Sequence, residues 1–419
     1  MIFSEISITA ARNLRTLVAA ASFFLFAAIV LSPAPANPRS ALAGTDPAFS
    51  KFVADLWPLA QEKGISRPTF DRAFEGVSFD PKVVARSRNQ AEFSEPIWQY
   101  LESAVSESRI DRGRAKAKAE SVWLDKAKEV YGVDEATIMG IWGMETEYGA
   151  FQGSDNVIKA LASLAYAHFR GDYFRDELIS ALWILEERDI GPAQMVGSWA
   201  GAMGQTQFMP SSFLRFAIDF DGNGKRDIWT NAADAIGSTA NYLSKQGWTP
   251  GLPWGFEVHL PADFKLNLED TSKFAPFAAF TQRGVVPVEN GAMPSEGSGQ
   301  LLIPSGLRGP IFLVTSNFKT IKTYNNSTAY ALGVALLGDA ILGRSGVHTP
   351  WPVRDKSLSQ IQVRELQSRL RKLGYDVGEI DGRIGEVLQA AVQKFQVKNG
   401  LPPDGYANSS LLQKAKDQQ

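Results

Sequence analysis

Apolar residues recur with a helical period through the first half of the chain. Leu178 and Leu182 are one pair, and Ala127 and Val130 are another, each spaced so that both members lie on one face of an α-helix. The same spacing extends over residues 48–242. The sequence therefore predicts a large body that begins as an all-helical fold.

The pattern changes between about residues 250 and 319. Short β-prone runs at 256–260 and 311–314 alternate there with glycine and proline, which is typical of strands separated by turns. Helical spacing returns at 330–342. We therefore expect a mainly α fold of the α+β class, with a small β-containing subdomain.

A stretch without any apolar period separates this domain from the C-terminal residues. It contains Gly346 and Pro350 together with several charges, a composition typical of interdomain linkers. Apolar residues at helical spacing and Asp-Gly turn signals follow. We predict a large domain at 44–345, a linker at 346–357 and a small bundle of two or three helices at 358–419.

The N-terminal residues have the pattern of a secretory signal peptide. Two arginines precede an uncharged apolar run at 17–31, and small residues follow up to Ala43. A membrane anchor is the competing interpretation, but this run is shorter than the roughly 20 residues that span a bilayer. We therefore predict export with removal of residues 1–43, with cleavage after Ala36 as the alternative.

The composition excludes several classes of protein. The chain has 419 residues, 44% of them hydrophobic and 21% charged, with a formal net charge of −2, which is ordinary for a soluble globular protein and unlike a polybasic nucleic-acid binder. It contains no cysteine. Disulfides, a thiol nucleophile, a thiolate metal site and a lipid anchor on an N-terminal cysteine are therefore all excluded. The three histidines are scattered and indicate no zinc site.

One carboxyl group lies on an apolar helix face. The residues from Glu135 to Tyr148 form a plausible helix, and Glu145 shares a face with Ile138 and Trp142 within it. Burial disfavours the charged form of a carboxyl group and raises its pKa, so such a group can act as a general acid. The alternative is a glutamate at the edge of the core whose carboxylate reaches solvent.

Two sequence motifs bear on the role of Glu145. The run at 143–149, Gly-Met-Glu-Thr-Glu-Tyr-Gly, and the run at 198–212 closely resemble the membrane-bound lytic murein transglycosylase B family. Further matches at 234–238 and 324–327 extend the resemblance over about residues 46–345.

The resemblance implies a lysozyme-like catalytic domain with Glu145 as its only catalytic acid and base. It implies cleavage of the β-1,4 bond between N-acetylmuramic acid and N-acetylglucosamine in peptidoglycan, with a 1,6-anhydromuramic product. Ordinary glycoside hydrolysis needs two carboxylates, whereas attack by the substrate's own C6 hydroxyl needs one. No cofactor is required for this chemistry.

The same resemblance assigns a set of residues to the sugar-binding cleft. The polar members would hydrogen-bond acetamido and hydroxyl groups, and the aromatic members would offer flat faces to pyranose rings. Core packing is the alternative for each aromatic residue, and above all for Phe208. The set is Ser198, Gln207, Phe208, Tyr242, Tyr324, Asn325 and Tyr330.

A loop starting at Asp219 has the spacing of a calcium-binding EF-hand loop, with Thr230 where a bidentate glutamate is usual. The resemblance implies that Asp234 closes such a site, although the intervening segment is one residue longer than the pattern. A turn-rich loop capped by its own side chains is the alternative. The predicted structural calcium ligands are Asp219, Asp221, Asn223, Asp234 and the backbone oxygen of Lys225.

The C-terminal residues resemble the type 1 peptidoglycan-binding module. The match spans about residues 358–415 and includes Asp381-Gly382 and Asp404-Gly405. The resemblance implies wall binding, and a structural appendage is the alternative.

These features together predict a periplasmic lytic transglycosylase that acts on peptidoglycan glycan strands. We expect a monomer that binds no nucleic acid and that meets cell-wall synthesis or division proteins. A lysozyme-like muramidase, with a second carboxylate such as Glu147, Asp155 or Asp172, is the first alternative. A noncatalytic wall-binding protein is the second.

Overall fold

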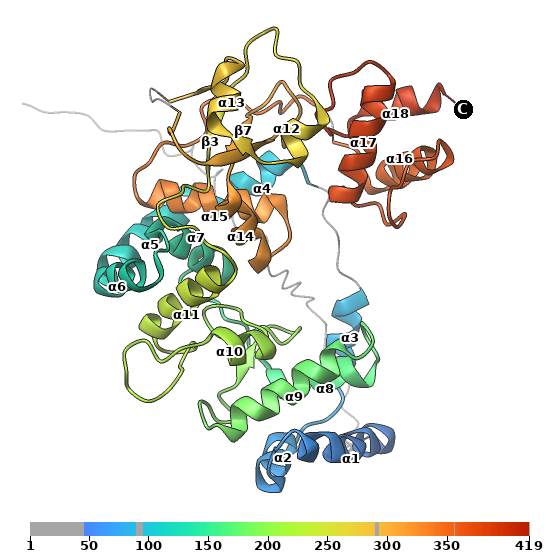
Figure 1. The fold of residues 1–419 in the computed structure, drawn as a ribbon. Helices are drawn as coiled ribbons and strands as arrows, with labels where there is room; N and C mark the ends of the chain where they lie inside the picture. The colour runs from blue at the N-terminus through green and yellow to red at the C-terminus, as the bar shows by residue number, and fades with distance from the viewer. Residues whose placement is uncertain (1–45, 89–94, 290–292, 356, 419) are drawn as a thin grey trace, which may run out of the picture. The chain divides into compact units, whose positions relative to one another are not determined.

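The computed structural model describes residues 46–88, 95–289, 293–355 and 357–418. The predicted signal peptide at 1–43 lies outside these residues. Within the described part of the chain, no helix is long and apolar enough to cross a membrane. The described residues form a helical body, a small sheet and three C-terminal helices (Figure 1).

The helical body confirms the expectation from the apolar period. Leu178 and Leu182 are completely buried, whereas Val130 is 57% exposed. Before the sheet, the helices are α1 Pro47–Glu62, α2 Arg67–Phe74, α3 Pro81–Arg88, α4 Ile97–Ala104, α5 Glu107–Ala119, α6 Ser121–Tyr131, α7 Glu135–Thr146, α8 Val157–Tyr166, α9 Tyr173–Glu186, α10 Pro210–Phe216 and α11 Ala232–Lys245. A short antiparallel pair, β1 Asp155–Asn156 and β2 Val196–Gly197, lies among them.

The predicted β-containing subdomain is a five-stranded antiparallel sheet with its own apolar core. Its strand order is β4-β6-β7-β3-β5, and Leu313 of β7 pairs with Phe256 of β3 and Leu301 of β6. The elements are β3 Gly255–His259, α12 Leu268–Ser272, β4 Ala275–Pro276, α13 Phe277–Gln282, β5 Val286–Pro287, β6 Ser298–Leu302 and β7 Phe312–Val314.

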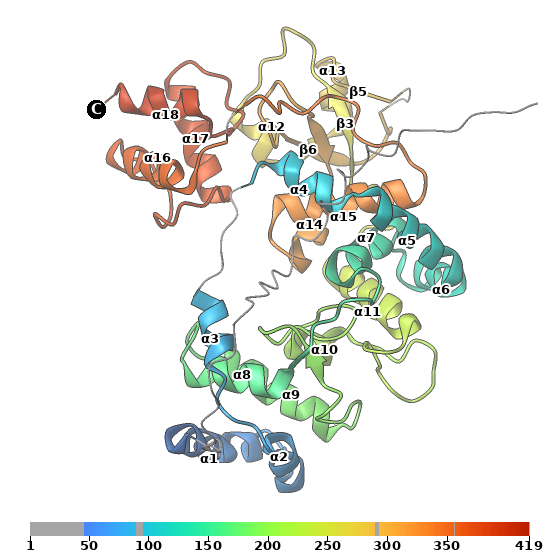
Figure 2. The ribbon, with the colours of Figure 1, turned by 180° about the vertical axis from the view of Figure 1, so that it is seen from behind.

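The chain returns from the sheet to the helical body through α14 Ser316–Tyr324 and α15 Thr328–Ile341. Helix α15 packs directly against α7 (Figure 2). A Cβ atom at Gly140 would lie 2.1 Å from the carbonyl oxygen of Val334, and one at Gly338 would lie 2.1 Å from that of Ala136. Glycine is therefore required at both positions, because the two backbones are in contact there.

The last three helices have a separate apolar core. They are α16 Gln360–Lys372, α17 Glu386–Lys398 and α18 Ser409–Lys416. Two buried glutamines on these helices hold the two Asp-Gly turns, since the Gly382 amide donates to Gln367 at 2.8 Å and the Gly405 amide donates to Gln396 at 2.9 Å. The helix number agrees with the sequence, while the exact domain boundaries stay predictions.

Candidate active site

Glu145 lies in the last turn of α7, at the edge of the main core. The helix begins at Glu135 and is capped by Asp134, whose carboxylate accepts a hydrogen bond from the Ala136 amide at 2.8 Å. It ends at Thr146, so the predicted end at Tyr148 is wrong by two residues. Most of the helix is buried, but Glu145 is partly exposed. The carboxyl group can therefore meet a ligand while much of its surroundings are apolar.

The surroundings of Glu145 adjust its acidity for proton transfer. Burial raises its pKa from the ordinary 4.5 to about 7, and the hydrogen bond from the Tyr330 hydroxyl, 2.5 Å from Oε1, offsets part of this rise. Neither cause is another carboxylate. Near neutral pH the group is divided between its protonated and ionised forms, so it can both donate and accept a proton.

Three tyrosines surround this carboxyl group. Burial first, and the charge of Glu145 second, raise the pKa of Tyr100 to about 12 and those of Tyr324 and Tyr330 well above 10. All three phenols therefore stay neutral and can donate hydrogen bonds. Tyr100, on α4, was not predicted from the sequence, because nothing in its local pattern separates it from an ordinary core tyrosine.

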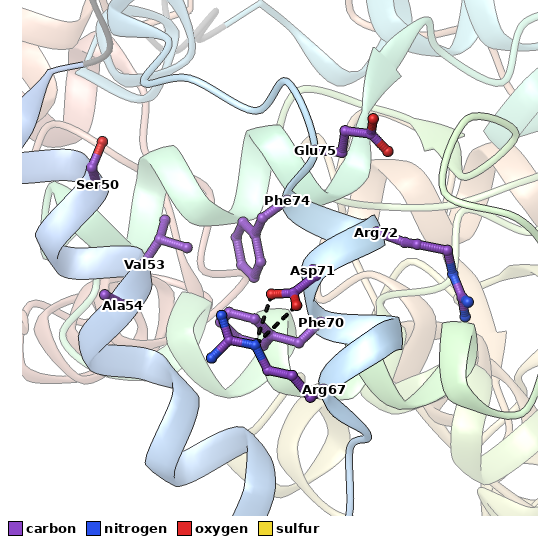
Figure 3. Close-up of a pocket in the computed structure, with 9 residues that line it drawn as sticks. All are labelled: Ser50, Val53, Ala54, Arg67, Phe70, Asp71, Arg72, Phe74 and Glu75. Atoms are coloured by element: carbon purple, nitrogen blue, oxygen red, sulfur yellow. Dashed lines mark hydrogen bonds and ion pairs between the residues drawn. The ribbon is translucent and has the colours of Figure 1, made fainter.

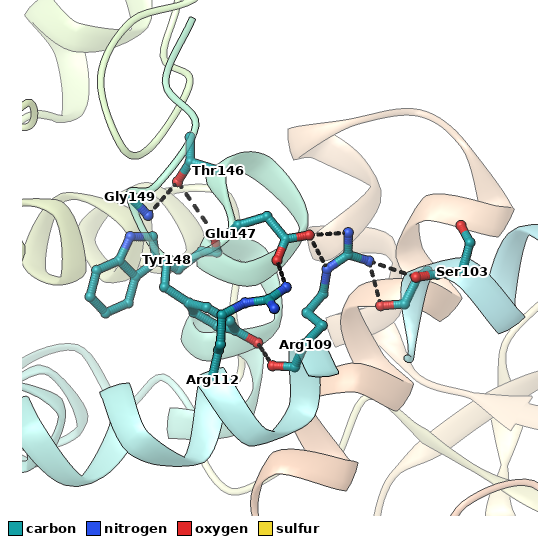
Figure 4. Close-up of polar contacts among 9 residues, drawn as sticks. Ser103, Arg109, Arg112, Thr146, Glu147, Tyr148 and Gly149 are labelled. Carbon is teal, nitrogen blue, oxygen red and sulfur yellow. Dashed lines mark hydrogen bonds and ion pairs between the residues drawn. The ribbon is translucent and has the colours of Figure 1, made fainter. Parts of the chain in front are cut away.

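The backbone after α7 is held in an unusual conformation. Glu147, Tyr148 and Gly149 have φ of 51°, 61° and 87°, a region that costs energy for residues other than glycine. Figure 4 shows the Glu147 carboxylate bound by both Arg109 and Arg112. The Tyr148 hydroxyl also donates to the Arg109 carbonyl at 2.9 Å.

These contacts decide the charge state of Glu147. Burial opposes ionisation, but hydrogen bonds and charge from Arg109 and Arg112 lower the pKa of Glu147 overall. Arg109 also donates to the carbonyls of Ser103 at 3.0 Å and Ala104 at 2.7 Å. It therefore joins the end of α4, which carries Tyr100, to the end of α7.

A second group of hydrogen bonds ties the end of α7 to the loop that follows β2. The Thr146 hydroxyl donates to the Gln205 carbonyl at 2.9 Å and accepts from the Gly149 amide at 3.0 Å. The Trp142 indole donates to the Gln205 side chain at 3.0 Å. Gln205 was not among the predicted site residues, and its contacts are with the protein itself.

The polar residues predicted for the cleft lie on two segments, the loop between β2 and α10 and the end of α14. Ser198 is partly exposed, and its hydroxyl accepts from the Ala202 amide at 3.1 Å. Gln207 donates to the carbonyls of Gln152 at 3.1 Å and Gly204 at 2.9 Å. Asn325 is exposed at the end of α14. Their binding of sugar stays a prediction.

Three of the four predicted aromatic residues are brought together in one cluster, and the fourth, Tyr330, is bound to Glu145. The ring of Tyr324 lies 5.8 Å from that of Phe208 and 4.8 Å from that of Tyr242. Phe208 is 2% exposed and Tyr242 is 8% exposed. The Tyr242 hydroxyl donates to the Thr323 carbonyl at 2.6 Å, and the Tyr324 hydroxyl donates to the Thr206 carbonyl at 2.7 Å. Core packing is thus the role that Phe208 and Tyr242 visibly have, while sugar contact stays a prediction for the cluster.

The carboxylates considered as a second catalytic group are each paired with arginine. Glu147 binds two arginines as described, Asp155 lies 3.1 Å from Arg86, and Asp172 lies 3.0 Å from Arg175. None of the three appears among the causes of the raised Glu145 pKa.

The structure brings three of the predicted calcium ligands together. One carboxylate oxygen from each of Asp219, Asp221 and Asp234 lies within 4.8 Å of the others. Asp234 is completely buried, and it accepts hydrogen bonds from the amides of Phe220 at 2.7 Å and Asp227 at 2.8 Å. Two carboxylates from the loop and one from the first turn of α11 are a suitable donor set for calcium.

The rest of that loop is organised by its own side chains. The Asn223 side chain accepts from the Lys225 amide at 3.0 Å, and the Asp227 side chain accepts from the amides of Trp229 and Thr230, both at 2.9 Å. The segment that is longer than the pattern does not separate Asp234 from the loop, since its carboxylate lies with those of Asp219 and Asp221.

A pocket elsewhere lies between α1 and α2 (Figure 3). Its most prominent polar contact is internal, since the Arg67 guanidinium donates to Asp71 at 2.8 Å and stacks 5.0 Å from the Trp57 ring centre. None of the predicted site residues lines this pocket. It therefore does not bear on the chemistry at Glu145.

Comparisons with protein families match both parts of the chain. The family of transglycosylase SLT domains matches residues 48–339, and a family of peptidoglycan binding domains matches residues 359–414. The chain is 36% identical over 224 residues to the membrane-bound lytic murein transglycosylase B of Escherichia coli (strain K12). This match covers 52% of the chain and 60% of that relative, which is less than two thirds of the relative's length.

Solved structures extend the similarity. SltB3 from Pseudomonas aeruginosa, in complex with NAG-anhNAM-pentapeptide, is 44% identical with a TM-score of 0.83, covering 88% of this chain and 99% of that chain. The Escherichia coli lytic transglycosylase Slt35, in complex with calcium, is 29% identical with a TM-score of 0.59, covering 72% of this chain and 96% of that one. These similarities confirm the predicted fold class.

Proposed function

Because the chain belongs to the transglycosylase SLT domain family, we propose that it is a lytic transglycosylase of peptidoglycan. It would cleave the β-1,4 bond between N-acetylmuramic acid and N-acetylglucosamine and leave 1,6-anhydromuramic acid ends. The observation that carries this proposal is a single partly buried carboxyl group, Glu145, with a pKa of about 7 and a neutral tyrosine donor bound to it. SltB3, the relative with 44% identity, binds a NAG-anhNAM-pentapeptide.

Glu145 would carry the proton in both steps. In its protonated form it donates the proton to the glycosidic oxygen as the bond to the anomeric carbon breaks. The ionised carboxylate, stabilised by the Tyr330 hydroxyl, then accepts the proton of the substrate's C6 hydroxyl as that oxygen bonds to the anomeric carbon. The donated proton leaves on the released hydroxyl group, the C6 hydroxyl proton restores the protonated form of Glu145, and no water is consumed.

The neighbouring groups support a one-carboxylate reaction. An intramolecular hydroxyl has a high effective concentration, so attack does not depend on a second carboxylate to activate water. Tyr100 and Tyr324 stay neutral beside Glu145. As neutral groups they add no further negative charge beside the carboxyl group.

The identity of the products tests this proposal. We expect muropeptides released from purified peptidoglycan by residues 44–419 to end in 1,6-anhydromuramic acid, which mass spectrometry distinguishes from a reducing end by the mass of one water. Reducing ends would instead support a lysozyme-like muramidase. No released muropeptide at all would support a noncatalytic wall-binding protein.

The C-terminal helices would hold the enzyme at its substrate. Residues 359–414 match a family of peptidoglycan binding domains, and a weak binder linked to the catalytic domain raises the effective concentration of glycan strands. We place the domains at 44–345 and 358–419, with a linker at 346–357.

Export would take the protein to the periplasm, where its substrate lies. This rests on the signal pattern at 1–43, and the absence of cysteine argues against a lipid anchor. We further propose that the enzyme is a monomer that encounters proteins of cell-wall synthesis or division.

The loop at Asp219 would bind a structural calcium ion. The three clustered carboxylates Asp219, Asp221 and Asp234 provide the donors, with Asn223 and the backbone oxygen of Lys225 completing the set. Calcium would neutralise the repulsion among these carboxylates and hold the start of α11 against the loop. It would take no part in the bond cleavage.

Calcium is expected to raise the midpoint of thermal unfolding of the wild-type protein by a few degrees, because a ligand bound only to the folded state stabilises it. Asp221→Asn should reduce this shift, since it removes one exposed carboxylate and leaves the hydrogen bonds of the buried Asp234 in place. Asp263→Asn, at another exposed position, is the control. Equal calcium shifts in all three proteins, measured after chelation and readdition, would contradict the site.

A further inference from the structure

An aromatic side chain is exposed close to the catalytic carboxyl group. Phe151 follows the left-handed turn at the end of α7 and is 68% exposed. Its ring makes no contact with another aromatic ring among the described residues. Most of the Phe151 side chain is therefore accessible to a ligand.

The backbone that carries Phe151 is firmly held. Its amide donates to the Thr146 carbonyl at 2.9 Å, one residue from Glu145. The next side chain, Gln152, donates to the carbonyls of Gly149 at 3.1 Å and Trp229 at 2.9 Å. A rigid backbone presents the ring at a fixed place and loses little conformational freedom when a ligand binds.

The segment also contacts two residues already predicted to bind sugar. Gln207 donates to the Gln152 carbonyl at 3.1 Å. A Cβ atom at Gly153 would lie 2.7 Å from the Ser198 amide nitrogen, so the two segments lie directly against each other. Phe151 therefore stands on a backbone bounded by the Glu145 turn, Gln207 and Ser198.

We propose that Phe151 forms a sugar-binding subsite, in which its ring stacks on the apolar face of a pyranose ring of the glycan strand beside the scissile bond. The ligand class follows from the side chain, since a benzyl group has no hydrogen-bonding atom and its flat face matches the C–H face of a pyranose. This inference rests on the proposed function, because it takes the glycan strand as the substrate.

Phe151→Ala is expected to raise KM for glycan strands about tenfold and to leave kcat within about twofold, because the lost contact is made equally in the ground and transition states. Phe151→Trp should restore KM, since it keeps a flat apolar face. Val130→Ala, which shortens another exposed apolar residue, on α6, is the control and should match the wild type. Unfolding midpoints would verify that all variants are folded.

The substrate should be glycan strands from which the stem peptides have been removed, compared with intact peptidoglycan. An effect of equal size on both supports stacking on sugar. A KM that is unchanged in Phe151→Ala, or an effect confined to the peptide-bearing substrate, would overturn the inference. These outcomes are distinct from failure of the proposed function, which would appear as wild-type protein that makes no anhydromuramic ends.

Discussion

Glu145→Gln is expected to abolish wall cleavage while leaving the fold intact. A glutamine keeps the shape of the side chain and can still accept the hydrogen bond from Tyr330, but it cannot donate or accept the transferred proton. General acid and base catalysis contributes about 10²- to 10⁴-fold to a rate, and here both roles fall on one group. We therefore expect release of anhydromuropeptides to fall by at least about a thousandfold.

The same substitution should stabilise the protein at neutral pH. The pKa of Glu145 is about 7 in the folded state against an ordinary 4.5, so the folded state binds the proton more tightly than the unfolded state does. The free energy of unfolding therefore falls as the pH rises from about 4.5 to about 7, by up to roughly 3 kcal/mol. A glutamine does not titrate, so the free energy of unfolding of Glu145→Gln should not fall in this way. It should equal that of the wild type near pH 4 and be higher than that of the wild type above pH 7.

Denaturant unfolding of both proteins across this pH range, together with product analysis, would check the two effects. Glu129→Gln removes a charge from an exposed position on α6 and is the matched control for net charge. Activity that survives in Glu145→Gln would refute the single-carboxylate mechanism. A stability difference that does not change with pH would refute the raised pKa.

The pH dependence of the wild-type enzyme follows from the same group. The reaction begins with protonated Glu145, and the neighbouring tyrosines stay neutral near pH 7, because burial and the charge of Glu145 raise their pKa values. We therefore expect kcat/KM to decline above about pH 7, approaching about a tenfold fall per pH unit.

The apolar pattern predicted the kinds of element but not their limits. Period alone placed Leu178 and Val130 in helices, and both are helical, yet one is buried and the other exposed. A helical period does not report how much of a helix surface its neighbours cover. The end of α7 was missed because Glu147 and Tyr148 have left-handed backbones that contacts with Arg109 and Arg112 stabilise, and these contacts are distant in sequence.

The sequence motifs identified Glu145 and Tyr330 as site residues, but the residues that surround them could not be predicted from the sequence. Tyr100 comes to the site only through the packing of α4 and through the bonds that Arg109 makes to both α4 and Glu147. Phe151 lies two residues beyond the 143–149 motif and was not predicted, because its exposure is evident only in the folded chain. Residues that belong to a local motif can thus be identified from the sequence, whereas residues brought to the site by contacts distant in sequence cannot.

Gly140→Ala, at the contact between α7 and α15, is expected to destabilise the protein. On an isolated helix this change would be favourable by about 1 kcal/mol. Here the new Cβ would lie 2.1 Å from the Val334 carbonyl oxygen and 2.9 Å from its carbonyl carbon, and backbone cannot move aside as a flexible side chain can. We expect a net loss of about 2 kcal/mol or more in the free energy of unfolding, because overpacking forces the helices apart.

Gly333→Ala separates the effect of the close contact from that of the added methyl group. Both glycines lie in this helix pair, but a Cβ at Gly333 would approach the flexible end of Met144 no closer than 3.2 Å, so its stability should be unchanged or slightly increased.

Helix α15 also carries Tyr330, and a displacement of about 1 Å at a catalytic group can cost about a hundredfold in rate. Gly140→Ala should therefore lower kcat even where it remains folded, and a variant with normal stability and normal kcat would show that the α7–α15 contact does not position the Tyr330 hydroxyl on Glu145.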